Sequence, residues 1–276
     1  QCCRDNGITP VVTLHHFTTP RWVAAMGGWG NDITSDLFAR FSDKVARGLG
    51  DEVGMWSTIN EPNMVSTIGY LLGEFPPGKK DRSLRLKAND VFCDAHRKSR
   101  DAVKSVSGAP LGITLAMQEY TIIGSNDDEL AQAAAHRDRA WAGLEDPFLE
   151  VAKGDDFFGV QTYTREIMDK DGRTKPTSDM RLTIMGYEFR PSALEACIRR
   201  AWEQTDHVPL IITENGVAAT DVVMNGDQLE AVVAKGPEGP VEYRAKKVIV
   251  ADGVRSQLGR RLGRQWHRDT AYGVAA

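Results

Sequence analysis

The alternation of short apolar runs with longer amphipathic segments is the feature that most constrains the fold of this chain. It extends from residue 1 to about residue 220, and each apolar run has the length of a buried strand. Strands that alternate with helices form a parallel sheet with the helices outside it. The sequence therefore predicts an α/β fold with strands at residues 11–14, 55–59, 111–115, 156–163 and 209–214.

Helices are expected between these strands. Thr34 and Ser35 are typical N-cap residues and are expected to begin the first helix, with Phe38, Phe41 and Val45 on one face. A closed barrel of alternating strands and helices needs eight strands, so five strands predict only part of such a barrel. The expected helices cover residues 34–46, 88–106, 127–151 and 192–202.

Two of the strands end at a glutamate. Glu61 lies between a strand and Pro62, which disfavours helical geometry at the residue before it. Glu214 ends the last strand, and the following Asn215-Gly216 pair is a strong turn signal. In a barrel of parallel strands the C-terminal ends share one mouth, so two such carboxylates could face each other across a sugar. Glycoside hydrolysis needs this pair, one as acid and one as nucleophile or base.

The composition is that of an ordinary globular chain, with 41% hydrophobic and 26% charged residues. Its 276 residues predict one or two domains. A net charge of −4 argues against a nucleic-acid or membrane partner, and no apolar run approaches the about 20 residues of a membrane span. The chain opens on Gln1, with neither an initiating Met nor a secretory signal, which indicates a fragment that begins inside a gene.

The four cysteines are Cys2, Cys3, Cys93 and Cys197. Their spacing fits neither a zinc site nor a disulfide framework. Free thiols in a reducing compartment are the expected state, so the sequence predicts a cytoplasmic protein without a bound metal.

The composition changes after about residue 221. Residues 222–276 contain nine Lys or Arg and six Asp or Glu, so this segment is net positive within a net negative chain. Short strands are expected at residues 227–234, 241–245 and 247–251, with a turn at 237–240 and a basic helix at 254–262. Because these strands lack crossover helices, they predict an antiparallel ribbon that does not complete the barrel.

Residues 1 to about 220 resemble glycoside hydrolase family 1, the β-glucosidase family. The resemblance rests on several short motifs in the family's order, and together they make coincidence negligible. These motifs are Thr13-Leu14-His15-His16-Phe17, Gly28-Trp29, Thr58-Ile59-Asn60-Glu61-Pro62, Gly69-Tyr70, Pro76-Pro77-Gly78, Gly159-Val160-Gln161-Thr162-Tyr163 and Ile212-Thr213-Glu214-Asn215-Gly216.

The resemblance implies a retaining mechanism on a (β/α)8 barrel, with no cofactor and no metal. It implies that Glu61 protonates the leaving oxygen and then deprotonates water, and that Glu214 attacks the anomeric carbon. Tyr163 would donate a hydrogen bond to Glu214 and orient it. The implied partner is a β-glucoside or a related small saccharide, and the oligomeric state stays open.

The resemblance also implies a set of sugar-binding residues. Asn60 would hold the sugar 2-hydroxyl, and His16 would bind another hydroxyl. Phe17 belongs to the same segment as His16, and Gln161 stands where the family usually has Asn. Since adjacent strand residues point to opposite faces, His15 is expected to pack behind the barrel.

The matched motifs correspond to about strands three to seven of the family's barrel. Its first two strands and its last strand, which supply further substrate-binding groups, find no match before Gln1 or after Gly216. We therefore expect an incomplete barrel over residues 1–220 with impaired activity. The alternative is an inactive chimeric fragment that binds sugar weakly at most.

Residues from about 222 to 276 resemble an internal segment of flavin-dependent geranylgeranyl reductases. The likeness rests on Val248-Ile249-Val250-Ala251-Asp252-Gly253-Val254-Arg255-Ser256 and on Gly263-Arg264-Gln265-Trp266-His267-Arg268. It implies a foreign tail over residues 221–276. A flavin-dependent reductase fragment is a remote alternative, because the glycine-rich dinucleotide fingerprint is missing upstream.

Overall fold

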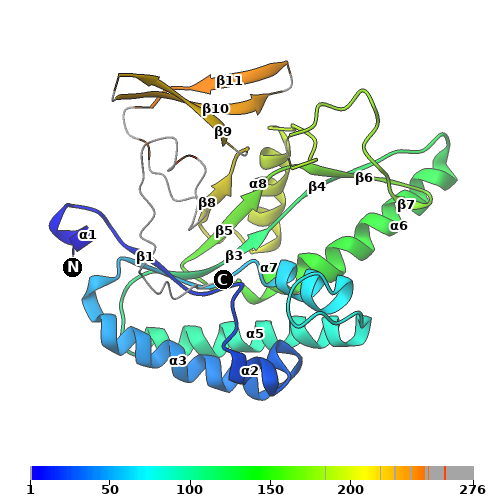
Figure 1. The fold of residues 1–276 in the computed structure, drawn as a ribbon. Helices are drawn as coiled ribbons and strands as arrows, with labels where there is room; N and C mark the ends of the chain where they lie inside the picture. The colour runs from blue at the N-terminus through cyan, green and yellow to red at the C-terminus, as the bar shows by residue number, and fades with distance from the viewer. Residues whose placement is uncertain are drawn as a thin grey trace.

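A five-stranded parallel sheet is the centre of the molecule, seen in a computed structural model (Figure 1). The structure describes residues 2–183, 185–217, 219–226, 228–236, 238–245, 248 and 258. Neighbouring strands pair in parallel in the order β1-β2-β3-β5-β8, as the alternating sequence predicts. The strands are β1 (Val11–His16), β2 (Met55–Asn60), β3 (Leu111–Ala116), β5 (Phe157–Thr162) and β8 (Leu210–Asn215).

Helices connect these strands and cover one face of the sheet (Figure 1). The two long helices α3 (Ile33–Leu49) and α5 (Arg82–Lys104) lie side by side, joined by a hydrogen bond between Ser42 and Ser99. The other main helices are α6 (Asp127–Leu144), α7 (Asp146–Val151) and α8 (Ala193–Gln204). Short helical turns are α1 (Cys2–Asp5), α2 (Arg21–Ala25), η1 (Gly28–Gly30), η2 (Gly50–Glu52), α4 (Pro62–Ser66) and η3 (Thr67–Leu72).

The core fills the space between the sheet and these helices. Large side chains from both layers are completely buried there, among them Trp56, Phe92, Phe148 and Phe158. The central strands β3 and β5 are buried almost throughout, which explains their continuous apolar runs in the sequence. Within the described residues, β1 and β8 are the two edges of this sheet, so the barrel is partial.

Two strands each carry one residue more than one neighbouring strand, β2 relative to β3 and β8 relative to β5. In β2, Ser57 pairs with Gly112 but Asn60 pairs with Thr114, so β2 uses three steps where β3 uses two. A similar irregularity in β8 separates the pair Ile212–Val160 from the pair Glu214–Gln161. An extra residue reverses the alternation of side chains from that point on. Both irregularities lie immediately before the C-terminal strand ends.

Two smaller sheets flank the main one. The first pairs β4 (Glu119–Ile122), β6 (Arg165–Asp169) and β7 (Gly172–Arg173), none of which the sequence predicted. The second is the antiparallel sheet of β9 (Ala219–Asn225), β10 (Gln228–Gly236) and β11 (Gly239–Tyr243). The predicted antiparallel ribbon is thus confirmed, although β9 was not expected. The predicted strand at 247–251, the helix at 254–262 and the two reductase-like motifs lie outside the described residues, apart from residues 248 and 258.

Several details of the helix predictions were wrong. Thr34 and Ser35 do not cap α3, because Asp32 already precedes its first residue. Instead, the Thr34 hydroxyl donates to the Gly28 carbonyl at 2.5 Å. Phe41 is 48% exposed, so it does not share the burial of Phe38. The single helix predicted at 127–151 is divided at residue 145 into α6 and α7. Among the described helices, none is long and apolar enough to cross a membrane.

Candidate active site

Glu61 is held in an unusual backbone conformation directly after β2. Its φ of 45° and ψ of 55° are left-handed, which is uncommon for a residue other than glycine. Pro62 begins α4, a helix that the sequence analysis did not predict, and the Glu61 N–H donates to the Thr114 carbonyl at 2.9 Å. The side chain is only 8% exposed. Backbone strain of this kind is found where surrounding structure fixes a functional residue.

Glu214 lies near the end of β8 and accepts two hydrogen bonds. The Tyr163 hydroxyl donates to its Oε2 at 2.5 Å, and the Gln161 Nε2 donates to its Oε1 at 2.8 Å. The extra residue in β8 sets Glu214 opposite Gln161 across the two strands. Burial, and then the bond to Glu214, raise the pKa of the Tyr163 hydroxyl, so it remains a donor.

Asn60 belongs to a hydrogen-bonded network that links Glu214 on β8 to His16 on β1, at the opposite edge of the sheet. Its Oδ1 accepts hydrogen bonds from Gln161 Nε2 at 2.9 Å and from Thr114 Oγ1 at 3.0 Å. Its Nδ2 lies 3.3 Å from His16 Nε2. Because an amide nitrogen only donates, this contact requires His16 Nε2 to be the acceptor. The network therefore runs from β1 through β2 and β5 to β8 at the C-terminal strand ends.

The two carboxylates interact electrostatically. Burial raises the pKa of Glu61 from 4.5 to about 7, and the negative charge of Glu214 adds to the rise. Glu61 is thus partly protonated near neutral pH and can donate a proton, whereas Glu214 accepts two hydrogen bonds. Two neighbouring acids in different surroundings can act as a donor and a nucleophile.

The remaining residues of the predicted set divide between the two faces. Phe17 does not join the hydrogen-bonded network, but its ring lies against His16 and Phe75. His15 is 5% exposed and packs behind the sheet on Trp29, Phe38 and Phe92, as predicted.

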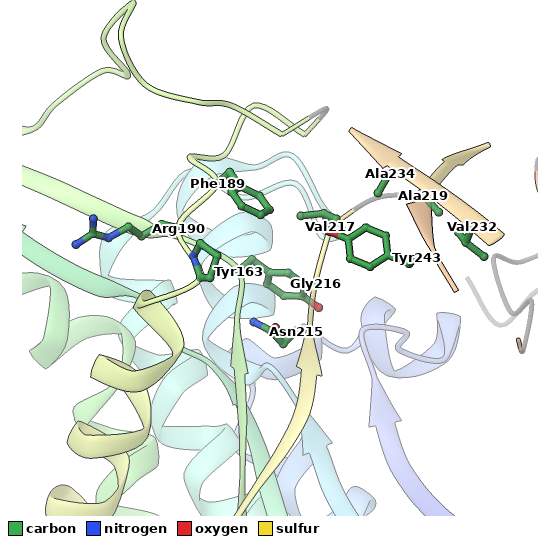
Figure 2. A pocket seen from close by; sticks show the side chains of 11 residues that line it. Tyr163, Phe189, Arg190, Asn215, Gly216, Val217, Ala219, Val232, Ala234 and Tyr243 are labelled. Atoms are coloured by element: carbon green, nitrogen blue, oxygen red, sulfur yellow. The ribbon is translucent and has the colours of Figure 1, made fainter. Parts of the chain in front are cut away.

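Sequence reasoning missed two parts of the site. Thr114 lies two residues before the end of β3, and its hydroxyl donates to Asn60, so no strand-end signal singled it out. A cavity of about 400 Å³ beside Tyr163 and Asn215 is partly lined by β9–β11 (Figure 2). Nothing in the sequence brings these distant segments together.

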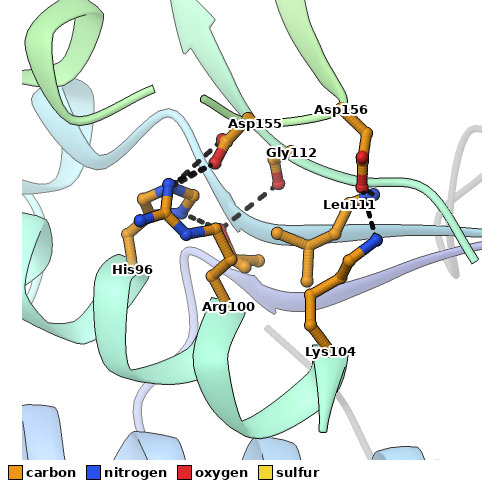
Figure 3. Close-up of polar contacts among 8 residues, drawn as sticks. His96, Arg100, Lys104, Leu111, Gly112, Asp155 and Asp156 are labelled. Carbon is orange, nitrogen blue, oxygen red and sulfur yellow. Dashed lines mark hydrogen bonds and ion pairs between the residues drawn. The ribbon is translucent and has the colours of Figure 1, made fainter. Parts of the chain in front are cut away.

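A buried cluster behind the sheet supports the end of β2 (Figure 3). Thr58 Oγ1 lies 2.7 Å from His96 Nδ1, and His96 Nε2 lies 3.1 Å from Asp155 Oδ2. Arg100 Nη1 donates to Asp155 Oδ1 at 3.0 Å. Thr58 faces α5 in this cluster, whereas Asn60, two residues later, faces the candidate site. The extra residue in β2 explains this difference.

Metal ligation has no support in the part of the chain that the structure describes, where no group of three or more His, Cys, Asp or Glu side chains could hold an ion. The four cysteines are free thiols, with Cys2 and Cys3 exposed and Cys93 and Cys197 buried.

Comparison with known proteins identifies the class of this fold and site. The model of glycosyl hydrolase family 1 matches residues 1–167, and the chain belongs to this family. The predicted family resemblance is thereby confirmed. Solved family 1 glycosidases share the partial (β/α)8 barrel seen here. The resemblance of the tail to flavin-dependent reductases stays a prediction.

Among curated relatives, the β-galactosidase of Saccharolobus solfataricus is 28% identical, covering 78% of this chain and 52% of the relative. β-Glucosidase A of Thermotoga maritima is 26% identical, covering 79% and 56%. Among solved structures, a β-glycosidase is 32% identical with a TM-score of 0.66, covering 79% of this chain and 56% of its own. The chain thus spans little more than half the length of these curated relatives.

Proposed function

We propose that this chain carries the catalytic pair of a retaining β-glycosidase that acts on a β-glucoside or a related small saccharide. The proposal rests on one observation: the two glutamates Glu61 and Glu214 interact electrostatically but have different surroundings. Glu214 is oriented by Tyr163 and Gln161, and the neighbouring Glu61 has a pKa raised to about 7. The names of the relatives, β-galactosidase and β-glucosidase, agree with this chemistry.

In the first step Glu214 attacks the anomeric carbon while Glu61 gives its proton to the departing oxygen. The bond to the leaving group breaks, and a covalent glycosyl ester forms on Glu214. In the second step Glu61, now ionised, removes a proton from water, and this water releases the sugar from Glu214. This route requires the two carboxyl groups to be about 5–5.5 Å apart.

Sugar binding is assigned to the polar network around Asn60. In this proposal Asn60 holds the 2-hydroxyl, and His16 binds a second hydroxyl. Gln161 spans Asn60 and Glu214 and so fixes both ends of the network, while Phe17 supports the His16 ring. Hydrogen bonds to the 2-hydroxyl strengthen in the transition state, so this network contributes to rate as well as to affinity.

The 276-residue chain is expected to be a weak catalyst. Glu214 lies on β8, an edge strand of the described sheet, so it lacks on one side the neighbours that a closed barrel supplies. In this proposal residues 1–220 are the incomplete barrel and residues 221–276 are a foreign tail. A cytoplasmic location, expected from the four free cysteines, stays a prediction.

Hydrolysis of aryl β-glucosides by wild type, Glu214→Gln and Glu61→Gln tests the assignment. Glu214→Gln should abolish turnover of every substrate, because no nucleophile remains. Glu61→Gln should retain more activity on 2,4-dinitrophenyl β-glucoside than on phenyl β-glucoside, since a good leaving group needs little protonation. Glu203→Gln, on the exposed face of α8, is the matched control and should behave as wild type.

Equal losses in both active-site variants on the dinitrophenyl substrate would contradict these roles. A calorimetric titration with deoxynojirimycin tests the alternative that the chain binds sugar without hydrolysing it. This compound is bound in a solved complex of the Thermotoga maritima β-glucosidase. Binding without any turnover by wild type would favour a sugar-binding fragment over an enzyme.

A further inference from the structure

Two consecutive residues of β2, Thr58 and Ile59, point towards the helices, although the side chains of a regular strand alternate between its two faces. Thr58 contacts His96 of α5, and Ile59 belongs to the core between the sheet and the helices. Both side chains are completely buried. We call these two residues the doubled step of β2. Because of this step, Asn60 returns to the face of the sheet that carries the candidate site.

Only Thr58 can hold the doubled step by a directed bond, because the Ile59 side chain has no polar atom. Thr58 Oγ1 lies 2.7 Å from His96 Nδ1 and 3.4 Å from the Gly112 carbonyl oxygen. A hydroxyl has one hydrogen to donate, and the shorter distance assigns it to His96. Apolar packing has no preferred direction, so the bond to His96 is what fixes the orientation of this step.

His96 is itself fixed from its other side (Figure 3). Its Nε2 lies 3.1 Å from Oδ2 of Asp155, in the loop before β5, and Arg100 Nη1 donates to Oδ1 of the same carboxyl group at 3.0 Å. A hydrogen bond to this carboxyl group requires the ring hydrogen on Nε2. In the neutral ring Nδ1 is then the acceptor, as the bond from the Thr58 hydroxyl requires. The cluster thus ties β2 to α5 and to the start of β5.

The doubled step leads directly into the candidate site. Asn60 follows Thr58 by two residues and Glu61 follows it by three. On the opposite face Thr114 holds both of them, since its hydroxyl donates to Asn60 Oδ1 at 3.0 Å and its carbonyl accepts from the Glu61 N–H at 2.9 Å. The segment is therefore held from both faces of the sheet. If the helix side were released, β2 could return to regular alternation and turn Asn60 away from the site.

We propose that Thr58 and His96 are positioning residues for the candidate site, because their hydrogen bond keeps the doubled step and so directs the Asn60 amide towards the sugar 2-hydroxyl. This inference rests on the proposed function for the sugar, but the orientation of Asn60 can be measured without turnover. Thr58 and His96 are completely buried behind the sheet, so they act on a substrate only through Asn60 and Glu61.

Three variants separate this role from a contribution to stability alone. Thr58→Val keeps the shape of the side chain and removes the hydroxyl, whereas Thr58→Ser keeps the hydroxyl and is the matched rescue. Ser42→Ala is the control for a purely structural loss, because it removes the buried hydrogen bond to Ser99 between α3 and α5. NMR of protein with labelled Asn and Glu side chains reports two signals: the contact of the Asn60 amide with the His16 ring, and the titration of the Glu61 carboxyl group.

In wild type and Thr58→Ser the Asn60 amide should contact the His16 ring, and Glu61 should titrate near its raised pKa of about 7. In Thr58→Val the contact should be lost, and the pKa of Glu61 should fall towards its ordinary value of 4.5. Binding of deoxynojirimycin by Thr58→Val should weaken at least about tenfold, as expected when a hydrogen bond to the ligand is lost. Ser42→Ala should be less stable than wild type and should keep both NMR signals and the affinity.

A folded Thr58→Val protein that keeps the contact between Asn60 and His16 would overturn the proposal. A wild type that lacks this contact, or a Thr58→Ser protein that loses it, would overturn it as well. If Thr58→Val does not fold, Arg100→Gln takes its place. Asp155 then keeps only its contact with His96, so the Asn60 contact should weaken, and an unchanged contact would refute the positioning role.

The positioning role and the proposed function fail separately. Loss of the Asn60 contact in Thr58→Val, in a protein whose wild type hydrolyses no glycoside, would support the positioning role and reject the function. Hydrolysis that depends on Glu214, together with an Asn60 contact that Thr58→Val leaves unchanged, would reject the positioning role and support the function.

Discussion

Replacing Glu61 by Gln should make the protein more stable at pH 8 while removing the proposed proton donor. In the folded chain the pKa of Glu61 is raised to about 7, first by burial and then by Glu214, whereas the ordinary value is 4.5. The folded state therefore binds a proton that the unfolded state has lost between these two pH values. The free energy of unfolding must then fall as pH rises from 4.5 towards 7.

The size of this effect follows from the two pKa values. Each pH unit between 4.5 and about 7 corresponds to about 1.4 kcal/mol, so the full loss is about 3 kcal/mol. Between pH 5 and pH 8 we expect the free energy of unfolding to fall by about 2 to 3 kcal/mol because of this group. Glu61→Gln lacks this titration, so its stability relative to wild type should rise by that amount over the same interval.

Urea unfolding at pH 5, 6, 7 and 8 measures the difference directly. Burial also raises the pKa of Glu145 to about 7, although Arg200 acts to lower it. Because Glu145 titrates in both proteins, its contribution cancels in the difference between them. Glu203→Gln should follow the wild-type curve. If Glu61→Gln also follows the wild-type curve, Glu61 ionises normally. It would then be deprotonated at neutral pH and could not serve as the acid.

Three further outcomes are expected. Tyr163→Phe should lower kcat by about 10- to 100-fold, because a hydrogen bond to a charged group contributes about 1.5–3 kcal/mol; an unchanged kcat in steady-state assays would contradict its orienting role. His96→Leu should lower the free energy of unfolding by about 3 kcal/mol, since it removes the ring that pairs with buried Thr58 and Asp155 and leaves Asp155 with Arg100 alone; a loss below about 1 kcal/mol in urea would contradict this. The 276-residue chain should associate through the edges of β1 and β8 and unfold with low cooperativity; sedimentation of a monomer with one sharp thermal transition and normal turnover would refute this.

The sequence predicted the inner strands β2, β3 and β5 of the main sheet well because they are buried on both faces. Burial on both faces leaves a continuous apolar run, which is easy to find. β6 was missed because Arg165–Asp169 is short and only alternately buried, so its pattern is weak against the polar residues around it. The start of α5 was placed six residues late. Its N-cap is Asp81, whose side chain accepts hydrogen bonds from the N–H groups of Ser83 and Leu84.

For the candidate site, the strand-end rule and the motifs predicted the residues and the hydrogen bond from Tyr163 to Glu214, but not the other connections. Gln161 bridges Asn60 and Glu214 across 101 and 53 positions of the chain, and no local pattern encodes such a link. For the same reason, the sequence could not predict that Tyr243 forms part of the cavity wall. It depends on where the β9–β11 sheet lies in space, and the strand pattern predicts only that this sheet forms.

The extra residue in β2 makes the site depend on the number of residues as well as on their identity. Thr58 faces α5 and Asn60 faces Glu214's side of the sheet only because three steps of β2 match two steps of β3. Removing one residue between Ser57 and Asn60 would turn Asn60 towards the helices. It would also take away Thr58 or Ile59, both completely buried, and would put β2 out of register with β1, where no residue is extra. A single-codon deletion there would therefore remove Asn60 from the candidate site and disturb the core together, a change that a survey of amino-acid substitutions alone would never encounter.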